Sequence, residues 1–257
     1  MTDLVTVAIL AKDKAHCLPL YLSCLEKQTY PKDKILLYIR TNNNTDNTQE
    51  ILDDWINLHR EEYKEIYYDT SDVDAPLHKY GQHEWNELRF AVLADIRQKS
   101  VEWAKEKGSH YFVVDCDNFI IPQTLDNLVS SHLPVIAPFL KTGETDTEHL
   151  SYSNYHHWVT ANGYFHETDG YWHIYNQDVT GYIEVALVHC TYLIRHEVLD
   201  KVSYAPDMSG RHEYVIFAEN LRKNKIRQWV DNCLSYGRIT FAETAEELGK
   251  ESWLDEF

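Results

Sequence analysis

The chain lacks an excess of basic residues. Its 24 Lys and Arg stand against 41 Asp and Glu, which gives the 257 residues a formal net charge of −17 at pH 7. Proteins that hold DNA or RNA need a basic surface to neutralise phosphates, and anionic membranes attract basic segments in the same way. Nucleic acids and anionic membranes are therefore not expected as partners. An anionic substrate would have to be held by a bound cation or by a few well-placed Arg residues.

The chain also lacks a long apolar run and any Cys-x-x-Cys pair. A helix that spans a membrane needs about 20 mostly apolar residues, so no membrane span is expected. The first apolar run is short and follows Asp3 rather than a basic segment, which argues against a signal peptide. The five Cys are scattered, and this predicts reduced thiols, no zinc site and a cytoplasmic location.

What the chain does contain, in residues 1–120, is an alternation of apolar strands and amphipathic helices. Strands are expected at residues 4–11, 35–41, 65–68 and 111–115, and helices at 17–27, from about 48 to 62 and at 83–107. In the second helix, Ile51, Leu52, Trp55 and Leu58 are expected to face inward. The alternation is typical of an α/β protein with a mostly parallel sheet. Ligands bind beyond the carboxyl ends of such strands, so polar residues there are the first candidates for a site.

The pattern changes after Pro122. Shorter elements are expected there: helices at residues 124–130 and 211–224, strands at 135–139, 185–195 and 226–230, and several short strands in the aromatic segment 151–195. Because no linker or repeat separates the two parts, we expect one domain over residues 1–257. Its halves would be residues 1–120 and 121–257.

The clearest local signal is the pair Asp115 and Asp117, directly after an apolar strand. Two carboxylates at the end of a strand suit a hard divalent cation such as Mn²⁺ or Mg²⁺, which often bridges to substrate phosphates. The alternative is a capped turn before Pro122. Arg89, on the long helix before this strand, is a candidate for holding a phosphate, with a solvated Arg as the alternative.

Other candidates follow at further strand and helix ends. In the loop at residues 42–48, polar side chains can hydrogen-bond a base or ribose, or simply cap the next helix. Glu213 begins a predicted helix and is a candidate general base for an acceptor hydroxyl, or a Glu that favours a helix N-terminus. His189 lies in an apolar strand, where core packing is the common role. His189 and His212 are the candidates if the metal has an imidazole ligand.

Taken in order, these segments resemble the amino-terminal domain of the procollagen galactosyltransferases, a family that includes the cerebral endothelial cell adhesion molecule. The resemblance covers about residues 4–240. It rests on VAILAKDKAHCLPLYLSCLEKQTYPKDK, on NTDNT at 44–48, on the spacing of Trp85, Arg89 and Arg97-Gln98, on YFVVDCDN at 111–118, on YSN at 152–154 with Gly163-Tyr164, on VHCT at 188–191, on IFA at 216–218 and on Tyr236-Gly237.

The resemblance implies a GT-A glycosyltransferase fold, with a Rossmann-like, mostly parallel sheet that binds a nucleotide sugar and a smaller, mixed acceptor-side lobe. It implies inverting transfer of galactose or glucose from a UDP-sugar to a hydroxyl on a protein or glycan, with hydroxylysine of a collagen-like protein as one candidate. The implied metal ligands are Asp115 and Asp117, which would hold Mn²⁺ or Mg²⁺, with His189 as a third ligand or acceptor contact. Arg89 would contact the phosphates, Asn44, Asp46 and Asn47 would contact uridine or ribose, and Glu213 would act as the base. Tyr152, Asn154 and Trp158 would lie beside the sugar.

The chain departs from the family pattern at two points. It has His212-Glu213 where the family has paired Asp residues, and Asn42 where the family has an Asp. A non-catalytic GT-A module that binds a glycan or a partner is therefore one alternative. A sugar nucleotidyltransferase is another, although it usually needs a Gly-rich loop after the first strand, and residues 11–16 contain no Gly.

Overall fold

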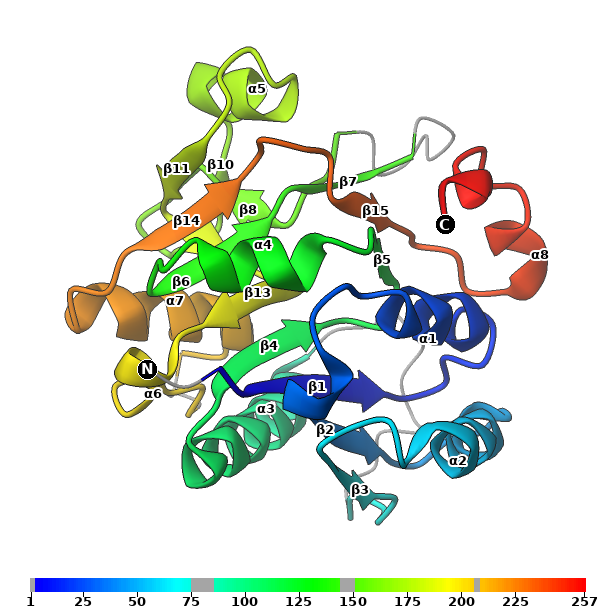
Figure 1. Cartoon of the computed structure of the whole chain (residues 1–257). Helices are drawn as coiled ribbons and strands as arrows, with labels where there is room; N and C mark the ends of the chain where they lie inside the picture. Colours follow the sequence, from blue (N-terminus) through cyan, green and yellow to red (C-terminus); the bar gives the residue numbers. More distant parts are fainter. Residues whose placement is uncertain (1–2, 75–85, 144–150, 206–208) are drawn as a thin grey trace.

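An eight-stranded sheet forms the centre of the protein. The computed structural model describes residues 3–74, 86–143, 151–205 and 209–257. The order of the strands is β11-β14-β6-β13-β4-β1-β2-β3 (Figure 1). Their bounds are β1 Val5–Ala11, β2 Ile35–Thr41, β3 Glu65–Asp69, β4 His110–Val114, β6 Val135–Pro138, β11 Tyr182–Val185, β13 Thr191–Ile194 and β14 Gln228–Asp231.

The half of the sheet from β4 to β3 is parallel, as the alternation of strands and helices predicted. β1 pairs in parallel with both β2 and β4, and β2 pairs in parallel with β3. The connecting helices are α1 (Leu18–Glu26), α2 (Thr48–His59) and α3 (Glu87–Lys107). All residues of β2 are buried, as expected of a strand that helices cover on both faces.

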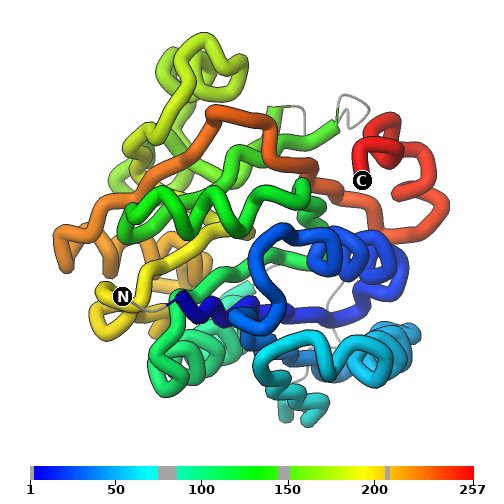
Figure 2. The backbone as a smooth tube through the Cα atoms, viewed as in Figure 1, coloured from blue at the N-terminus to red at the C-terminus, as the bar shows by residue number. Residues whose placement is uncertain are grey.

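Side chains of β1 alternate between two cores, one on each face of the sheet. Val5, Val7 and Ile9 pack with α1 and α2, whereas Ala8 packs with α3 and with α7 (Glu213–Lys223). The C-terminal end of the chain also packs against the first of these faces. In Figure 2 the red C-terminal segment lies beside the blue helix α1, and Lys27 bonds the carbonyl of Phe257. The sheet therefore has helices on both faces.

The other half of the sheet is mixed. β13 runs antiparallel between β4 and β6, β14 is parallel to β6, and β11 is an antiparallel edge. The prediction of one strand over residues 185–195 is wrong. Cys190 has a left-handed backbone with φ of 62°, and it divides the segment into β12 (Leu187–Val188) and β13. β12 pairs with β8 (Tyr155–His156) in a separate small sheet.

The remaining elements surround this frame. β5 (Asn118–Ile120), β15 (Gly237–Ile239) and β7 (Leu140–Thr142) form a three-stranded sheet, and a ribbon pairs β9 (Trp158–Val159) with β10 (Phe165–His166). The short helices are α4 Thr124–Ser130, α5 Asp169–Tyr175, α6 His196–Leu199 and α8 Ala245–Leu248. The sequence pattern did not predict α5 or β15.

Two helix predictions need correction. The inward face of α2 consists of Leu52, Trp55 and Ile56, whereas Leu58, expected to face inward, is 76% exposed. α3 begins at Glu87 rather than at residue 83, and residues 83–85, with Trp85, lie outside the described part of the chain. Its predicted end is confirmed, because Gly108 caps the helix with φ of 63°.

Gly237 offers a test of the close packing between β15 and β5, the strand that follows Asp117. A Cβ at position 237 would lie 1.9 Å from the carbonyl oxygen of Phe119. We expect Gly237→Ala to lower the free energy of unfolding by roughly 1–3 kcal/mol, since the backbone must move to relieve the clash. Chemical denaturation measures this change.

Gly249→Ala is the matched control, because a Cβ there would lie 3.2 Å or more from its neighbours. Its stability should stay within about 0.5 kcal/mol of the unsubstituted chain. Equal stabilities of the two variants would contradict the packing described between β15 and β5.

Candidate functional site

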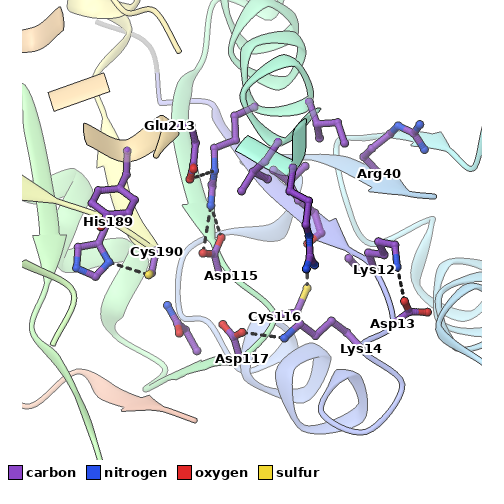
Figure 3. Close-up of a pocket in the computed structure, with 18 of the residues that line it drawn as sticks. Lys12, Asp13, Lys14, Arg40, Asp115, Cys116, Asp117, His189, Cys190 and Glu213 are labelled. Atoms are coloured by element: carbon purple, nitrogen blue, oxygen red, sulfur yellow. Dashed lines mark hydrogen bonds and ion pairs between the residues drawn. The ribbon is translucent and has the colours of Figure 1, made fainter. Parts of the chain in front are cut away.

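A cavity of about 600 Å³ opens at the carboxyl ends of β1, β2 and β4 (Figure 3). This is the edge of the sheet where ligands were expected. Its walls come from the β1–α1 loop, the end of β2, α3, the β4–β5 turn, the β12–β13 turn and the start of α7. Segments that are far apart in sequence therefore meet at one opening.

The cavity concentrates basic residues in an acidic chain. Among the described residues that line it are five of the 24 Lys and Arg and four of the 41 Asp and Glu. The basic ones are Lys12, Lys14, Arg40, Arg89 and Arg97, and the acidic ones are Asp13, Asp115, Asp117 and Glu213. Such a cavity suits an anionic ligand that is held partly by basic side chains.

Asp115 lies at the floor of the cavity and is paired with Arg97. The Nη2 atom of Arg97 lies 2.9 Å and 3.1 Å from the two carboxylate oxygens. The backbone N–H of Asp115 donates to the carbonyl of Cys190, so the β4 end is also fixed from the β12–β13 side. Burial raises the pKa of Asp115, and the Arg97 guanidinium opposes that shift.

Asp117 is paired with a different basic side chain, Lys14 of the β1–α1 loop. The Lys14 Nζ atom lies 2.9 Å from Oδ2 of Asp117, and the two side chains are 19% and 30% exposed. Burial acts against the charge of Lys14, but the Asp117 carboxylate raises the pKa of Lys14 above its usual value. Lys14 therefore stays an ammonium group at the cavity wall.

Glu213 is the first residue of α7 and is only 4% exposed. Its Oε1 atom lies 3.5 Å from Nε of Arg97, so one guanidinium lies between Glu213 and Asp115. Figure 3 shows the carboxylates of Glu213, Asp115 and Asp117 along one side of the cavity. Each of the three has a basic partner. Burial raises the pKa of Glu213, as it does that of Asp115.

Arg97 is a site residue whose role the sequence did not predict, because only its spacing on the long helix marks it there. It is buried, and its Nη1 atom has no hydrogen-bond partner among the described residues. A signal was present in the sequence. Arg97 falls on the buried stripe of α3 that includes Ala94, Val101 and Ala104, where a charged residue needs a specific partner.

His189 lies in the cavity wall with a neutral ring, because burial lowers its pKa well below the usual range. Its Nδ1 atom lies 2.8 Å from the sulfur of Cys190, and its Nε2 atom has no partner among the described residues. Within that part of the chain, no three His, Cys, Asp or Glu side chains are arranged to hold a metal. The structure thus does not join His189 to Asp115 and Asp117 as a third ligand.

His212 belongs to the same aromatic wall. Its ring lies 4.0 Å from that of Phe90 and 5.2 Å from that of Tyr214, centroid to centroid. Burial lowers the pKa of His212, which favours the neutral ring. Tyr214 in turn lies 5.3 Å from His189, so rings rather than charges form this side of the cavity.

The polar loop after β2 lines the cavity with Asn42 and Thr45, whereas the side chains of Asn44 and Asp46 bond the β1–α1 loop. Asn44 accepts from the backbone N–H of Asp13, and Asp46 accepts from that of Ala15. Asn47 is exposed, without a side-chain cap bond to α2. None of these three side chains is among the described lining residues, although their neighbour Thr45 is, together with Arg40 and Asn42.

The other sugar-side and phosphate candidates lie in different places. Arg89 lines the cavity from the first turn of α3, and Tyr152 also lines it. Asn154 is fully buried, and its amide bonds the backbone at residues 138, 140 and 191. Trp158 is 60% exposed on β9 and is not among the described lining residues.

The chemistry of Asp115 and Asp117 fits a hard divalent cation that shares its ligands with a substrate. Mg²⁺ and related ions often use one or two carboxylates together with substrate phosphates. Asp115 and Asp117 are both part-exposed and both line the cavity. Each already has a basic partner, so the residues fit such an ion as shared ligands rather than as a complete cage.

Solved structures with a similar fold are glycosyltransferases. TarS of S. aureus, solved as residues 1–349, superposes with a TM-score of 0.59 at 16% identity, over 92% of this chain and 60% of that one. GalNAc-T7, solved with UDP, GalNAc and Mn²⁺, gives 0.55 at 12% identity, over 92% and 43%. The fold is therefore the GT-A glycosyltransferase fold, as the resemblance implied.

The family follows from the sequence comparison. The family model for the N-terminal domain of glycosyltransferase family 25 matches residues 2–252, and the chain belongs to that family. It is 33% identical to human procollagen galactosyltransferase 2 over 91% of this chain and 38% of the relative. It is 31% identical to the human inactive glycosyltransferase 25 family member 3, over 79% and 34%. The chain thus spans well under half the length of these relatives.

The described residues include no helix that is both long and apolar enough to cross a membrane.

Arg97 should be essential for stability. Replacing it by Met leaves the buried carboxylate of Glu213 and the part-buried carboxylate of Asp115 without their shared cation, and breaking a buried pair typically costs about 3–5 kcal/mol. Loss of the Arg97 charge should raise the pKa of Asp115 and Glu213 further. A carboxyl group whose pKa is raised in the folded state stabilises the fold at low pH, and that contribution is lost as pH rises. The stability lost in Arg97→Met should therefore be larger at pH 8 than at pH 5.

Denaturant unfolding at both pH values measures this loss. Arg227→Met is the control, because Arg227 and its partner Glu184 are both more than half exposed. Exposed pairs contribute at most about 1 kcal/mol. A loss in Arg97→Met that is as small as in the control, or that does not change with pH, would contradict the shared-cation arrangement.

Proposed function

We propose that this domain is a metal-dependent, inverting glycosyltransferase that moves a hexose from a UDP-sugar to a hydroxyl group on a protein or glycan. The observation that carries the proposal is the pair Asp115 and Asp117 at the carboxyl end of β4, inside a cavity rich in basic side chains. Family 25 membership and the GT-A fold support it. The name of the human relative, procollagen galactosyltransferase 2, supports galactose and a collagen-like acceptor.

The donor would lie across the ends of β1, β2 and β4. Lys14 and Arg89 line the cavity and would supply positive charge to the diphosphate, and Asn42, directly after β2, would contact the nucleoside. Arg40 also lines the cavity, but its guanidinium is already bonded to Asp69 and to the backbone carbonyls of residues 41 and 71. Asn44 and Asp46 serve the donor indirectly in this proposal, because their side chains hold the β1–α1 loop. Arg97 brings a further N–H donor to the cavity.

Asp115 and Asp117 are the residues that would hold Mn²⁺ or Mg²⁺. When bound, such an ion would neutralise the negative charge that develops on the leaving diphosphate. His189 is neutral and packs against Tyr214, so we assign it to the acceptor side of the cavity.

Glu213 is the proposed general base. It lies in the cavity wall, and a positioned carboxylate that takes the proton of the acceptor hydroxyl contributes about 10²–10⁴-fold. The Arg97 guanidinium opposes the rise that burial causes in the pKa of Glu213, since an opposite charge favours the ionised carboxylate. In single displacement the deprotonated hydroxyl attacks the anomeric carbon as the bond to UDP breaks.

A non-catalytic module is the second candidate. The relative named inactive glycosyltransferase 25 family member 3 is 31% identical over 79% of this chain, so this sequence family includes a member described as inactive. In this reading the charged cavity would bind a nucleotide sugar or glycan without transfer.

A sugar nucleotidyltransferase is less well supported. The backbone N–H groups of Asp13, Lys14 and Ala15 already donate to side chains of the β2–α2 segment. They are therefore occupied and do not form the open cradle that a triphosphate needs.

Release of UDP from UDP-galactose and UDP-glucose, with Mn²⁺, Mg²⁺ or EDTA, tests the proposed function. We expect hydrolysis of one donor that depends on metal and falls by about 10²–10³-fold in Asp117→Ala, since charge stabilisation at a leaving group is typically worth that much. Asp126→Ala, on the exposed face of α4, is the control and should keep full activity. Binding of UDP-sugar without any turnover, even with acceptor, would favour the non-catalytic module.

The pH dependence of transfer tests Glu213. Because burial raises its pKa above the ordinary 4.5, and because a base works only when deprotonated, kcat/KM should fall as pH drops through that raised pKa. Glu213→Gln should lose about 10²–10⁴-fold and also lose this acidic limb, whereas Glu213→Asp should keep the limb. An unchanged limb in Glu213→Gln would remove Glu213 from the role of base.

A further inference from the structure

Both candidate metal carboxylates are already neutralised by basic side chains of the protein, but the two pairs differ in freedom. Arg97 is held on two sides, by Asp115 and Glu213, and its side chain is 6% exposed. Lys14 is 19% exposed, and among the described residues its ammonium pairs only with Asp117. Of the two cations, Lys14 is the one with room to change partners.

The backbone that carries Lys14 is fixed from the neighbouring loop. Asn44 accepts from the N–H of Asp13 at 3.0 Å, Thr48 from that of Lys14 at 2.7 Å, and Asp46 from that of Ala15 at 2.9 Å. Three successive N–H groups are thus held by side chains of one short polar segment. This clamp fixes the base of the Lys14 side chain and leaves its flexible end at the cavity.

We propose that Lys14 is a built-in counter-ion of Asp117 that makes binding of the divalent cation depend on the nucleotide diphosphate, and that Asn44, Asp46 and Thr48 are positioning residues for it. This inference rests on the proposed function. Without a nucleotide, a divalent cation at Asp117 would lie close to the Lys14 ammonium, and the like charges repel. A diphosphate offers Lys14 another anionic partner and frees Asp117. Each ligand therefore raises the affinity for the other, by the same factor.

Binding of Mn²⁺ measured by the electron paramagnetic resonance signal of the free ion, with and without UDP, tests the proposal without any turnover. In the unsubstituted chain we expect UDP to raise the affinity for Mn²⁺ by at least about fivefold, the lower end of typical coupling between two ligands. Lys14→Met should bind Mn²⁺ more tightly than the unsubstituted chain when UDP is absent, and UDP should then raise the affinity by a smaller factor, the part that remains being due to direct contact between the phosphates and the ion. Lys14→Arg, which keeps the charge, should restore the coupling.

Lys12→Met is the matched control. Lys12 lies on the same loop and lines the same cavity, but its ammonium pairs with Asp13 rather than with Asp117. Its affinity for Mn²⁺ without UDP should match that of the unsubstituted chain. Circular dichroism checks that each variant is folded, and Lys14→Gln replaces Lys14→Met if the latter is not.

The outcomes separate this inference from the proposed function. If Mn²⁺ and UDP both bind but Lys14→Met keeps the affinity and the coupling of the unsubstituted chain, the role of Lys14 is refuted and the transferase proposal stands. If the unsubstituted chain binds neither Mn²⁺ nor UDP, the proposed function fails, and the role of Lys14 fails with it. Loss of the coupling in Asn44→Ala, with Lys14 intact, would support the clamp.

Discussion

The arrangement of the site depends on one buried guanidinium. Arg97 comes from α3, Asp115 from the end of β4 and Glu213 from the start of α7, and the three lie in contact beneath the cavity. A buried charge is costly unless it is paired, and an Arg offers a rigid, planar set of donors that two carboxylates can share. Because the partners belong to three elements, the same interaction that offsets the cost of burial also fixes where the candidate metal ligand and the candidate base stand relative to each other.

The topology of the sheet explains why these groups meet at β4. β4 has the parallel strand β1 on one side and the antiparallel strand β13 on the other. The loop that leaves β1 and the turn that enters β13 therefore both reach the carboxyl end of β4. The left-handed backbone at Cys190 makes this possible, since it reverses the chain out of β12 and directs the Cys190 carbonyl to the N–H of Asp115.

Much of this could be predicted from the sequence, where local signals were strong. The apolar runs of β1, β2 and β4 and the Gly108 stop of α3 are local features, and they placed Asp115 and Asp117 at the correct edge of the sheet. What failed depends on contacts between distant segments. No Gly or Pro marks the break at Cys190, and a polar loop that faces a ligand has the same composition as one that faces another loop. That Asn44 and Asp46 contact the nucleotide stays a prediction, and the sequence did not indicate that their side chains bond the backbone of residues 13 and 15.

The charge balance of the cavity follows from the same constraint. A chain with a net charge of −17 repels any anionic ligand at long range, and the cations that line the cavity offset this repulsion locally. Unpaired Lys and Arg side chains would attract an anionic ligand best. Close to carboxylates inside the cavity, however, these side chains form ion pairs. The pairs stabilise the empty cavity, and a ligand that carries both negative phosphates and a positive ion can replace both halves of the Lys14–Asp117 pair at once. An anion or a cation alone replaces only one half and leaves the other unpaired, and this favours the joint binding of a nucleotide diphosphate and its metal over the binding of either one.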